Sequence, residues 1–270
     1  MMASILDKIF AAKRAELDAQ RRIVSLASII DRALQAPAPR DLVAALRAHQ
    51  PAIIAEVKRA SPSKGDIFPG LDPATVALDY VAGGAAAISV LTDRHFKGSL
   101  DDLRAVRAAV DLPLLRKDFM FDEYQLHEAR AAGADAILLI VAMLPQDQLA
   151  TLVAKAKALG LAALVEVHNQ EEFARAIAID ADLIGINNRD LHTFKTDLAT
   201  SEDLLKDYAG SALIVAESGL EIPADIRRLY RAGARAFLIG ESLLREGNPL
   251  SALSLLTHPL DASSSEDQTR

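Results

Sequence analysis

Two lysines and two glutamates lie at the ends of short apolar runs in this sequence. Glu56 and Lys58 end the first run, Lys117 follows a later one, and Glu166 lies within another. A lysine surrounded by carboxylates keeps its proton and can act as a general acid, whereas a carboxylate screened from water has a raised pKa and becomes a better base. These four residues predict an acid–base site; the alternative is structural ion pairs at the end of a sheet.

Other polar and aromatic groups follow further apolar runs. Asn187 and Arg189 end one run two residues apart, so in a strand both side chains project to the same side. A guanidinium fork suits a carboxylate or a phosphate, although hydrogen bonding at the rim and a surface ion pair would also explain the two residues. Phe96 and Phe119 lie just beyond two runs and are candidates to line a pocket for an aromatic ring, with core packing as the alternative.

Eight apolar runs recur along the chain, and helical segments with Leu and Ala at three-to-four spacing separate nearly all of them. The glycines in Ala132–Ala136 and Ala232–Ala236 are typical of helix C-caps that lead into a strand. Runs that are apolar throughout indicate a parallel sheet covered on both faces, and eight such units predict a (β/α)8 TIM barrel. The runs are Ile53–Val57, Ala85–Leu91, Leu112–Leu115, Ala136–Ala142, Leu161–Val167, Leu183–Ile186, Leu213–Ala216 and Phe237–Ile239.

In such a barrel the polar strand ends meet at one rim, where active sites of this fold are found. Glycine-containing segments follow the last two runs, Glu217–Leu220 and Ile239–Leu243. Barrels commonly bind phosphate at these positions with backbone N–H groups, which glycine allows to approach closely. The segments favour a phosphate-bearing substrate, and the polar loop that begins at Ser61 is a candidate to supply hydroxyls; simple turns are the alternative.

Composition excludes several classes of function. The net charge of −7, with both signs interspersed, argues against nucleic acid or an anionic membrane as the main partner. The longest apolar stretch, Ala136–Leu144, is too short to span a bilayer. The chain has no Cys and six scattered His, and it lacks GxGxxG and Walker sequences, so we predict a cytoplasmic protein without metal or nucleotide cofactor.

Evenly spaced units without an internal linker indicate one domain. We predict a barrel over 1–256, including a helical extension over 1–49, followed by a disordered tail over 257–270. Within the extension, the sequence predicts an amphipathic helix from about Ile5 to Leu17 and a second helix at about Asp41 to Ala48. The extension is expected to cover one end of the barrel, and the sequence leaves open whether that is the mouth or the bottom.

With these motifs in this order, the chain resembles the indole-3-glycerol-phosphate synthase family from about Ile5 to Leu256. The matching segments are distributed over the whole barrel. Together they are specific for the family, although no single segment would be. The matching segments are Ile54–Ser63, Leu115–Phe119, Leu164–His168, Ile184–Leu191, Ala216–Gly219 and Leu238–Leu243.

The resemblance implies an enzyme that closes 1-(2-carboxyphenylamino)-1-deoxyribulose 5-phosphate to indole-3-glycerol phosphate with loss of carbon dioxide and water. It implies that Lys117 is the general acid for the substrate carbonyl oxygen and that Glu166 is the base in a later proton removal. Lys58, paired with Glu56, assists as an acid and charge partner. The family needs no cofactor, and its tryptophan-biosynthetic substrate is the expected small-molecule partner; we expect a monomer or weak homo-oligomer.

The resemblance also implies roles for the remaining candidate residues. Asn187 and Ser218 position the reacting groups, and Arg189 helps to hold the anionic substrate. The other expected substrate-binding residues are Ser61, Phe96, Phe119, Glu217, Gly219, Gly240 and Glu241.

Two other readings of the same barrel stay open. A Schiff-base aldolase would use Lys58 or Lys117 as a nucleophile with a lowered pKa. A non-catalytic phosphosugar-binding barrel would keep the fold without the reaction, but binding alone does not require two lysines and two glutamates at the mouth.

Overall fold

The structure is a computed structural model that describes residues 5–61, 65–68, 70–190, 193–245 and 247–257, without the side chains of 5–8 and 61. The predicted tail lies outside this part of the chain from 258 onward. Thr257, the first residue assigned to the tail, caps the last helix, and its hydroxyl donates to the Gly83 carbonyl oxygen at 3.2 Å.

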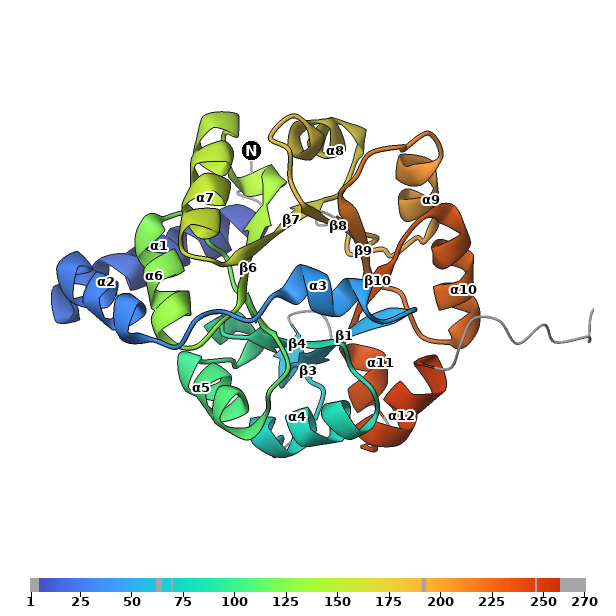
Figure 1. The fold of residues 1–270 in the computed structure, drawn as a ribbon, viewed down its shortest axis with the longest axis horizontal. Coiled ribbons are helices and arrows are strands. Elements are labelled where there is room, and N and C mark those ends of the chain that lie inside the picture. Colours follow the sequence, from blue (N-terminus) through green and yellow to red (C-terminus); the bar gives the residue numbers. More distant parts are fainter. Residues whose placement is uncertain (1–4, 62–64, 69, 191–192, 246, 258–270) are drawn as a thin grey trace, which may run out of the picture.

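Eight parallel strands form a closed barrel, which confirms the predicted fold (Figure 1). Each apolar run of the sequence overlaps one strand, because a strand covered by helices outside and filled by side chains inside is buried on both faces. The barrel strands are β1 (Ala52–Val57), β4 (Ala87–Leu91), β5 (Leu114–Lys117), β6 (Ala136–Ile140), β7 (Ala162–Val167), β8 (Leu183–Asn187), β9 (Leu213–Glu217) and β10 (Ala236–Ile239). A short antiparallel pair, β2 (Ala60–Ser61) and β3 (Gly65–Asp66), follows β1.

Helices surround the barrel and connect its strands (Figure 1). Most begin at a Ser, Asp or Asn whose side chain accepts a hydrogen bond from the first turn, as Ser99 does for Asp102. The helices of this ring are α4 (Pro73–Ala82), α5 (Leu100–Ala109), α6 (Glu123–Ala131), α7 (Gln146–Ala158), α8 (Gln170–Ile177), α9 (Ala199–Leu205), α10 (Pro223–Ala232), α11 (Glu241–Leu244) and α12 (Pro249–Leu256), with short 3-10 turns η1 (Arg94–Phe96) and η2 (Val141–Met143).

Alternation along the strands places apolar groups low in the barrel and polar groups at its mouth. In β1, Ile53 joins the apolar layer under the helices, whereas Ile54 belongs to the interior cluster. Because side chains repeat every two residues, the next inward position after Ile54 is Glu56, and β5 likewise places Lys117 above Leu115. The carboxyl ends of the strands therefore carry an inward ring of polar groups.

In the described chain from residue 5 onward, three helices precede the barrel: α1 (Ile5–Ile23), α2 (Leu26–Gln35) and α3 (Leu42–Arg47). The second predicted helix corresponds to α3. Its Leu42 and Leu46 are buried in the interior cluster with Ala52 and Ile54, so α3 closes the amino-terminal end of the barrel, where Figure 1 shows it crossing the strands.

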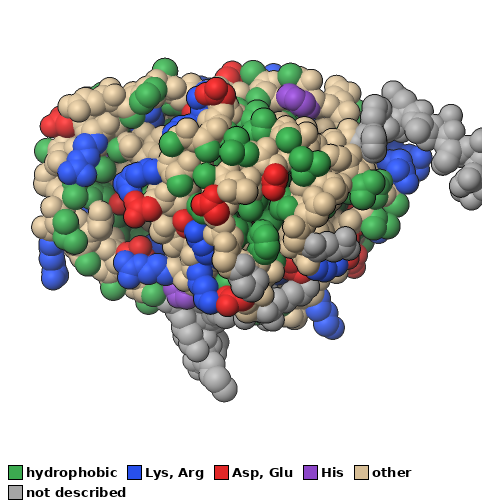
Figure 2. Space-filling view, turned by 90° about the horizontal axis from the view of Figure 1, so that it is seen from below, with side chains coloured by type: hydrophobic (Ala, Val, Ile, Leu, Met, Phe, Trp, Pro, Cys, Tyr) green, Lys and Arg blue, Asp and Glu red, His purple; other side chains and the backbone are tan. Residues whose placement is uncertain are grey.

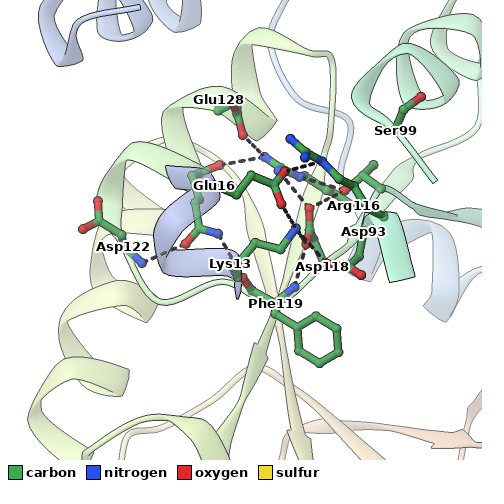
Figure 3. A network of polar contacts seen from close by, with 12 residues as sticks. Lys13, Glu16, Asp93, Ser99, Arg116, Asp118, Phe119, Asp122 and Glu128 are labelled. Carbon is green, nitrogen blue, oxygen red and sulfur yellow. Dashed lines mark hydrogen bonds and ion pairs between the residues drawn. The ribbon is translucent and has the colours of Figure 1, made fainter. Parts of the chain in front are cut away.

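The first predicted helix, α1, lies at the opposite end. The Lys13 ammonium forms ion pairs of 2.8 Å with Asp93 and Asp118, which follow β4 and β5 (Figure 3). The question that the sequence left open therefore has two answers: α1 lies at the mouth, and α3 covers the bottom. The sequence did not predict α2, which packs beside α6, where the Tyr124 hydroxyl donates to the Val24 carbonyl oxygen at 3.1 Å.

Candidate active site

A cavity of about 430 Å³ opens at the carboxyl ends of the strands. Its wall contains every predicted site residue except Ser61, which lies in β2 with its side chain outside the described part of the chain. The predicted residues in the wall are Glu56, Lys58, Phe96, Lys117, Phe119, Glu166, Asn187, Arg189, Glu217, Ser218, Gly219, Gly240 and Glu241.

Lys117 lies between two carboxylates inside this cavity. Its Nζ is 3.0 Å from Glu166 Oε2 and 3.3 Å from Glu217 Oε2. Burial disfavours the charged amine, but Glu166 and Glu217 outweigh burial and raise the pKa of Lys117 well above its usual range. Lys117 is therefore protonated at neutral pH and can donate a proton to a bound substrate.

Glu166 is held by donors on both of its oxygens. Asn187 Nδ2 donates to Oε1 at 3.2 Å, and the Ser218 hydroxyl donates to Asn187 Oδ1 at 2.8 Å, which fixes the amide. Burial alone would raise the pKa of Glu166, but Lys117 and the neighbouring His168 lower it well below the usual range for a carboxyl group. The residue is thus an oriented carboxylate.

Glu217 differs from Glu166 although both contact the same amine. Burial and the like charges of Glu166 and Glu56 raise its pKa to about 8, against the opposing effect of Lys117. Its Oε1 is buried beside Gly185, where a Cβ atom would lie 2.2 Å from that oxygen. The sequence predicted Glu217 only as a substrate-binding residue, and the structure brings it into contact with the proposed acid.

Glu56 and Lys58 form the second pair at the mouth. Lys58 Nζ lies 2.8 Å from Glu56 Oε1, so the two side chains lie on the same side, as their spacing predicts. Gly240 packs directly on this pair, since a Cβ atom at that position would be 2.7 Å from Glu56 Oε1. A glycine at position 240 therefore allows the backbone to pack closely against the Glu56 side chain.

The loops after β9 and β10 form another part of the cavity wall. Ser218 and Gly219 both have left-handed backbones, with φ of 66° and 77°, and both residues line the cavity. The Ser242 hydroxyl donates to the Leu220 carbonyl oxygen at 2.9 Å and joins the two loops. Nearby, the Nε of Arg189 is buried without a hydrogen-bond partner among the described atoms.

Both aromatic residues that the sequence predicted lie in the wall, which also contains Phe194. The centroids of Phe96 and Phe119 are 6.4 Å apart, and both rings line the cavity. Asp118 accepts a hydrogen bond from the Phe119 backbone N–H at 2.9 Å, and Asp93 accepts one from the N–H of His95 at 2.8 Å. The aromatic segments are therefore anchored by the two aspartates that bind Lys13.

Lys13 belongs to a buried network that sequence reasoning missed (Figure 3). Lys13 is 3% exposed. Its partner Asp118 also forms an ion pair of 2.9 Å with Arg116. The other terminal nitrogen of Arg116 lies 2.9 Å from Glu128. One turn before Lys13, Ile9 lines the cavity. The repeated aspartates after two apolar runs were a usable signal, but nothing in the chain before the first strand indicated which lysine would reach them.

His168 is a second missed residue. Its Nε2 lies 3.3 Å from Glu166 Oε1, and its Nδ1 lies 3.0 Å from Glu172 Oε2. His168 follows Glu166 by two residues, so the two side chains project to the same side of the strand. This spacing was the feature of the sequence that could have predicted their contact.

Among the described residues, no group of three or more His, Asp or Glu is arranged to hold a metal ion. In the same part of the chain, no helix combines the length and the apolar character needed to cross a membrane. On the face shown in Figure 2, positive and negative side chains are intermixed.

The family model described as indole-3-glycerol phosphate synthase matches residues 6–256. The chain belongs to this family. A relative of that name from Mycolicibacterium gilvum is 50% identical over 262 residues, covering 95% of this chain and 96% of the relative. Another from a Nocardioides species is 50% identical over 255 residues, covering 94% and 98% of the two chains. Members of the indole-3-glycerol phosphate synthase family are carboxy-lyases of tryptophan biosynthesis.

Two solved structures share the fold at low identity. N-acetylmannosamine-6-phosphate 2-epimerase from Clostridium perfringens has a TM-score of 0.60 at 16% identity and covers 74% of this chain and 91% of its own. Thiamine phosphate pyrophosphorylase from Pyrococcus furiosus has a TM-score of 0.57 at 17% identity, with coverages of 80% and 96%. These likenesses concern the barrel alone.

Proposed function

We propose that this cavity closes 1-(2-carboxyphenylamino)-1-deoxyribulose 5-phosphate to indole-3-glycerol phosphate, with Lys117 as the acid and Glu166 as the base. The observation that carries the proposal is the charged Lys117 amine held between Glu166 and Glu217 within the cavity. An acid and a base in one enclosed site are what ring closure followed by dehydration requires.

The first bond forms when the aromatic carbon that bears the carboxylate attacks the ketone carbon. Negative charge develops on the ketone oxygen, and Lys117 supplies a proton to it. Carbon dioxide then leaves, and its bonding electrons return to the ring system. Loss of the new hydroxyl as water, with proton removal by Glu166, completes the indole; Lys58 beside Glu56 assists as an acid and charge partner.

Binding of the substrate uses the rest of the wall. The phosphate is assigned to the turn at Ser218 and Gly219, to the loop at Gly240 and to Ser61. Arg189 contributes a guanidinium whose buried Nε lacks a partner among the described atoms, which suits an anionic group. Phe96 and Phe119 offer their faces to the anthranilate ring.

The charge state of Lys117 argues against an aldolase that uses this lysine as its nucleophile. A Schiff-base nucleophile must be a neutral amine, which is achieved by a lowered pKa. The pKa of Lys117 is raised by Glu166 and Glu217 despite burial. A binding barrel without catalysis is disfavoured because the buried ionisable side chains of Glu166 and Glu217 would be costly to retain without a use.

The test is indole fluorescence on mixing the protein with the substrate, since the chain has no Trp and gives little background. We expect the wild type to produce the signal, and Lys117→Met to reduce turnover by about 10²- to 10⁴-fold, the typical contribution of a general acid. Glu166→Gln should lose turnover to a similar extent. Calorimetric titration should find substrate affinity in both variants within about tenfold of the wild type.

Lys157→Met is the matched control, because that lysine side chain is 79% exposed and outside the cavity wall. It should turn over like the wild type. Near-normal turnover in Lys117→Met would remove Lys117 from the role of acid, and substrate binding by the wild type without indole formation would support the binding barrel.

A further inference from the structure

His168 lies between two carboxylates immediately behind the proposed base. It follows β7 two residues after Glu166, and its Nε2 and Nδ1 lie 3.3 Å from Glu166 Oε1 and 3.0 Å from Glu172 Oε2. The side chain is 9% exposed. Nδ1 is within hydrogen-bond distance of Glu172, whereas Nε2 lies against Glu166 at ion-pair distance without a hydrogen bond. A neutral imidazole would place no charge between the two carboxylates, whereas an imidazolium carries a positive charge that both attract.

Glu172 is positioned by the start of α8 rather than by His168 alone. The backbone N–H of His168 donates to Glu172 Oε2 at 2.9 Å, and Asn169 Nδ2 donates to Oε1 at 2.8 Å. Asn169 in turn caps α8 by accepting from the N–H of Glu172 at 3.0 Å. The carboxylate that holds the imidazole is thus fixed by the helix end.

Two basic side chains lie against Glu166, one at each oxygen: Lys117 at Oε2 and His168 at Oε1. The other ionisable groups at this site are Glu217 and Glu56, whose negative charges oppose ionisation of Glu166 when they are present, and Lys58, which is paired with Glu56. When Lys117 gives its proton to the substrate, its positive charge is lost from the Oε2 side. His168 is then the basic side chain left in contact with Glu166 among the described residues.

We propose that His168, held as an imidazolium by Glu172, is a positioning residue that keeps Glu166 ionised while Lys117 delivers its proton. The inference deepens the proposed function and rests on it for its catalytic meaning. Without His168, a buried carboxylate beside a lysine could take the lysine proton itself, because burial favours the neutral pair. His168 therefore directs that proton to the substrate. The pKa of His168 agrees: burial lowers it, but Glu166 and Glu172 raise it to about 9.

The first experiment is a ¹⁵N NMR titration of the histidine rings, which does not depend on turnover. His168→Gln identifies the His168 signals by their loss. We expect an imidazolium at pH 7.5 that titrates near pH 9 in the wild type, with the midpoint at least one pH unit lower in Glu172→Gln and also lower in Glu166→Gln. A His168 ring that is neutral at pH 7.5 would overturn the proposal, whether or not the protein forms indole.

The second experiment is the pH profile of kcat/KM for His168→Gln, whose amide keeps a donor but has no charge. We expect the acid limb to lie at least one pH unit higher than in the wild type, with KM at the optimum within about threefold. His127→Gln is the control, because His127 is also buried and contacts a glutamate, Glu123, at 3.5 Å, outside the cavity wall. An acid limb in His168→Gln that coincides with those of the wild type and His127→Gln would show a purely structural residue.

Discussion

Neighbouring charges give two chemically identical side chains of the cavity opposite protonation states. Glu166 receives Lys117 and His168 as partners and stays ionised, whereas burial raises the pKa of Glu217 to about 8, so it is mostly protonated at neutral pH. The environments of the two carboxyl groups thus separate their pKa values within one site. The cluster titrates jointly, and a change at any member alters the others.

The close packing of Gly240 on Glu56 leads to a prediction at the residue scale. Gly240→Ala places a Cβ atom 2.7 Å from Glu56 Oε1 and 2.9 Å from its Cβ, although the φ of −132° suits an L-residue. The Glu56 carboxylate must move and its contact with Lys58 loosens. We expect kcat/KM for indole formation to fall by about 10- to 100-fold, in the range that small misplacements in an active site cost.

Gly83→Ala is the control for steric strain outside the cavity. A Cβ atom there would meet Leu253 at 3.1 Å, again with an ordinary φ of −80°. We expect this variant to melt at a lower temperature and to keep its kcat/KM. Equal activity in both variants would show that Glu56 tolerates displacement.

The sequence predicted the residues of the cavity better than it predicted their partners. Glu56, Lys117 and Glu166 were found because a strand end and a period of two place them at the rim. The contacts of Lys13 and His168 depend on how a helix docks and how a ring turns, which periodicity does not encode.

At the scale of elements, α1 is part of the cavity wall as well as a cover for the barrel. Ile9 and Lys13 are four residues apart and therefore share one face of the helix. Ile9 reaches the cavity, and Lys13 holds the helix to Asp93 and Asp118. The position of the Phe96 and Phe119 segments is thus tied to the docking of α1.

Lys13→Met tests this coupling. The change leaves Asp93 and Asp118 without their shared cation, and removing one partner of a buried ion pair costs about 3–5 kcal/mol. Asp118 keeps Arg116, so the loss falls mainly on Asp93 and on the docking of α1. We expect KM to rise about fivefold or more with kcat within about threefold, together with a lower melting temperature.

Arg22→Met, at an exposed position of the same helix, is the matched control and should change neither parameter. A Lys13→Met enzyme that melts earlier but keeps its KM would restrict Lys13 to stability.

The sequence predicted those elements that local apolar patterns encode and missed one that tertiary contacts place. All eight strands were predicted because burial on both faces leaves continuous apolar runs. The helix α2 was not predicted: it buries only Ile29 and Ala33 and packs on α6 outside the repeating strand–helix pattern. Its place depends on tertiary contacts with one neighbour.

At the scale of the whole molecule, the barrel has a stabilising end and a reactive end. Leu42 and Leu46 of α3 extend the apolar interior at the amino-terminal end, where burial is favourable. The carboxyl end holds ionisable groups whose protonation differs between the folded and unfolded chain. The pH dependence of stability should therefore originate largely at the mouth.

The folded protein should lose stability as the pH rises from about 6.5 to 9. The folded pKa of His168, about 9, exceeds the ordinary value of 6.5, so its contribution is complete below pH 6.5 and disappears as the pH rises through 9. Glu217 acts in the same direction, because its folded pKa of about 8 exceeds the ordinary 4.5 and the fold favours its neutral form. At roughly 1.4 kcal/mol per pKa unit, His168 alone corresponds to a loss on the order of 3 kcal/mol.

Urea unfolding midpoints at pH 6.5 and 9.5 measure this loss for the wild type, His168→Gln and Glu217→Gln. Each variant removes one of the two groups that bind more protons in the folded state than in the unfolded state, so each should show a smaller decline than the wild type. A wild-type decline reproduced in full by both variants would place the responsible groups elsewhere in the barrel. A smaller decline in His168→Gln alone would assign the pH dependence to the imidazolium between Glu166 and Glu172. Glu217 would then have the same protonation in the folded and the unfolded chain over this pH range.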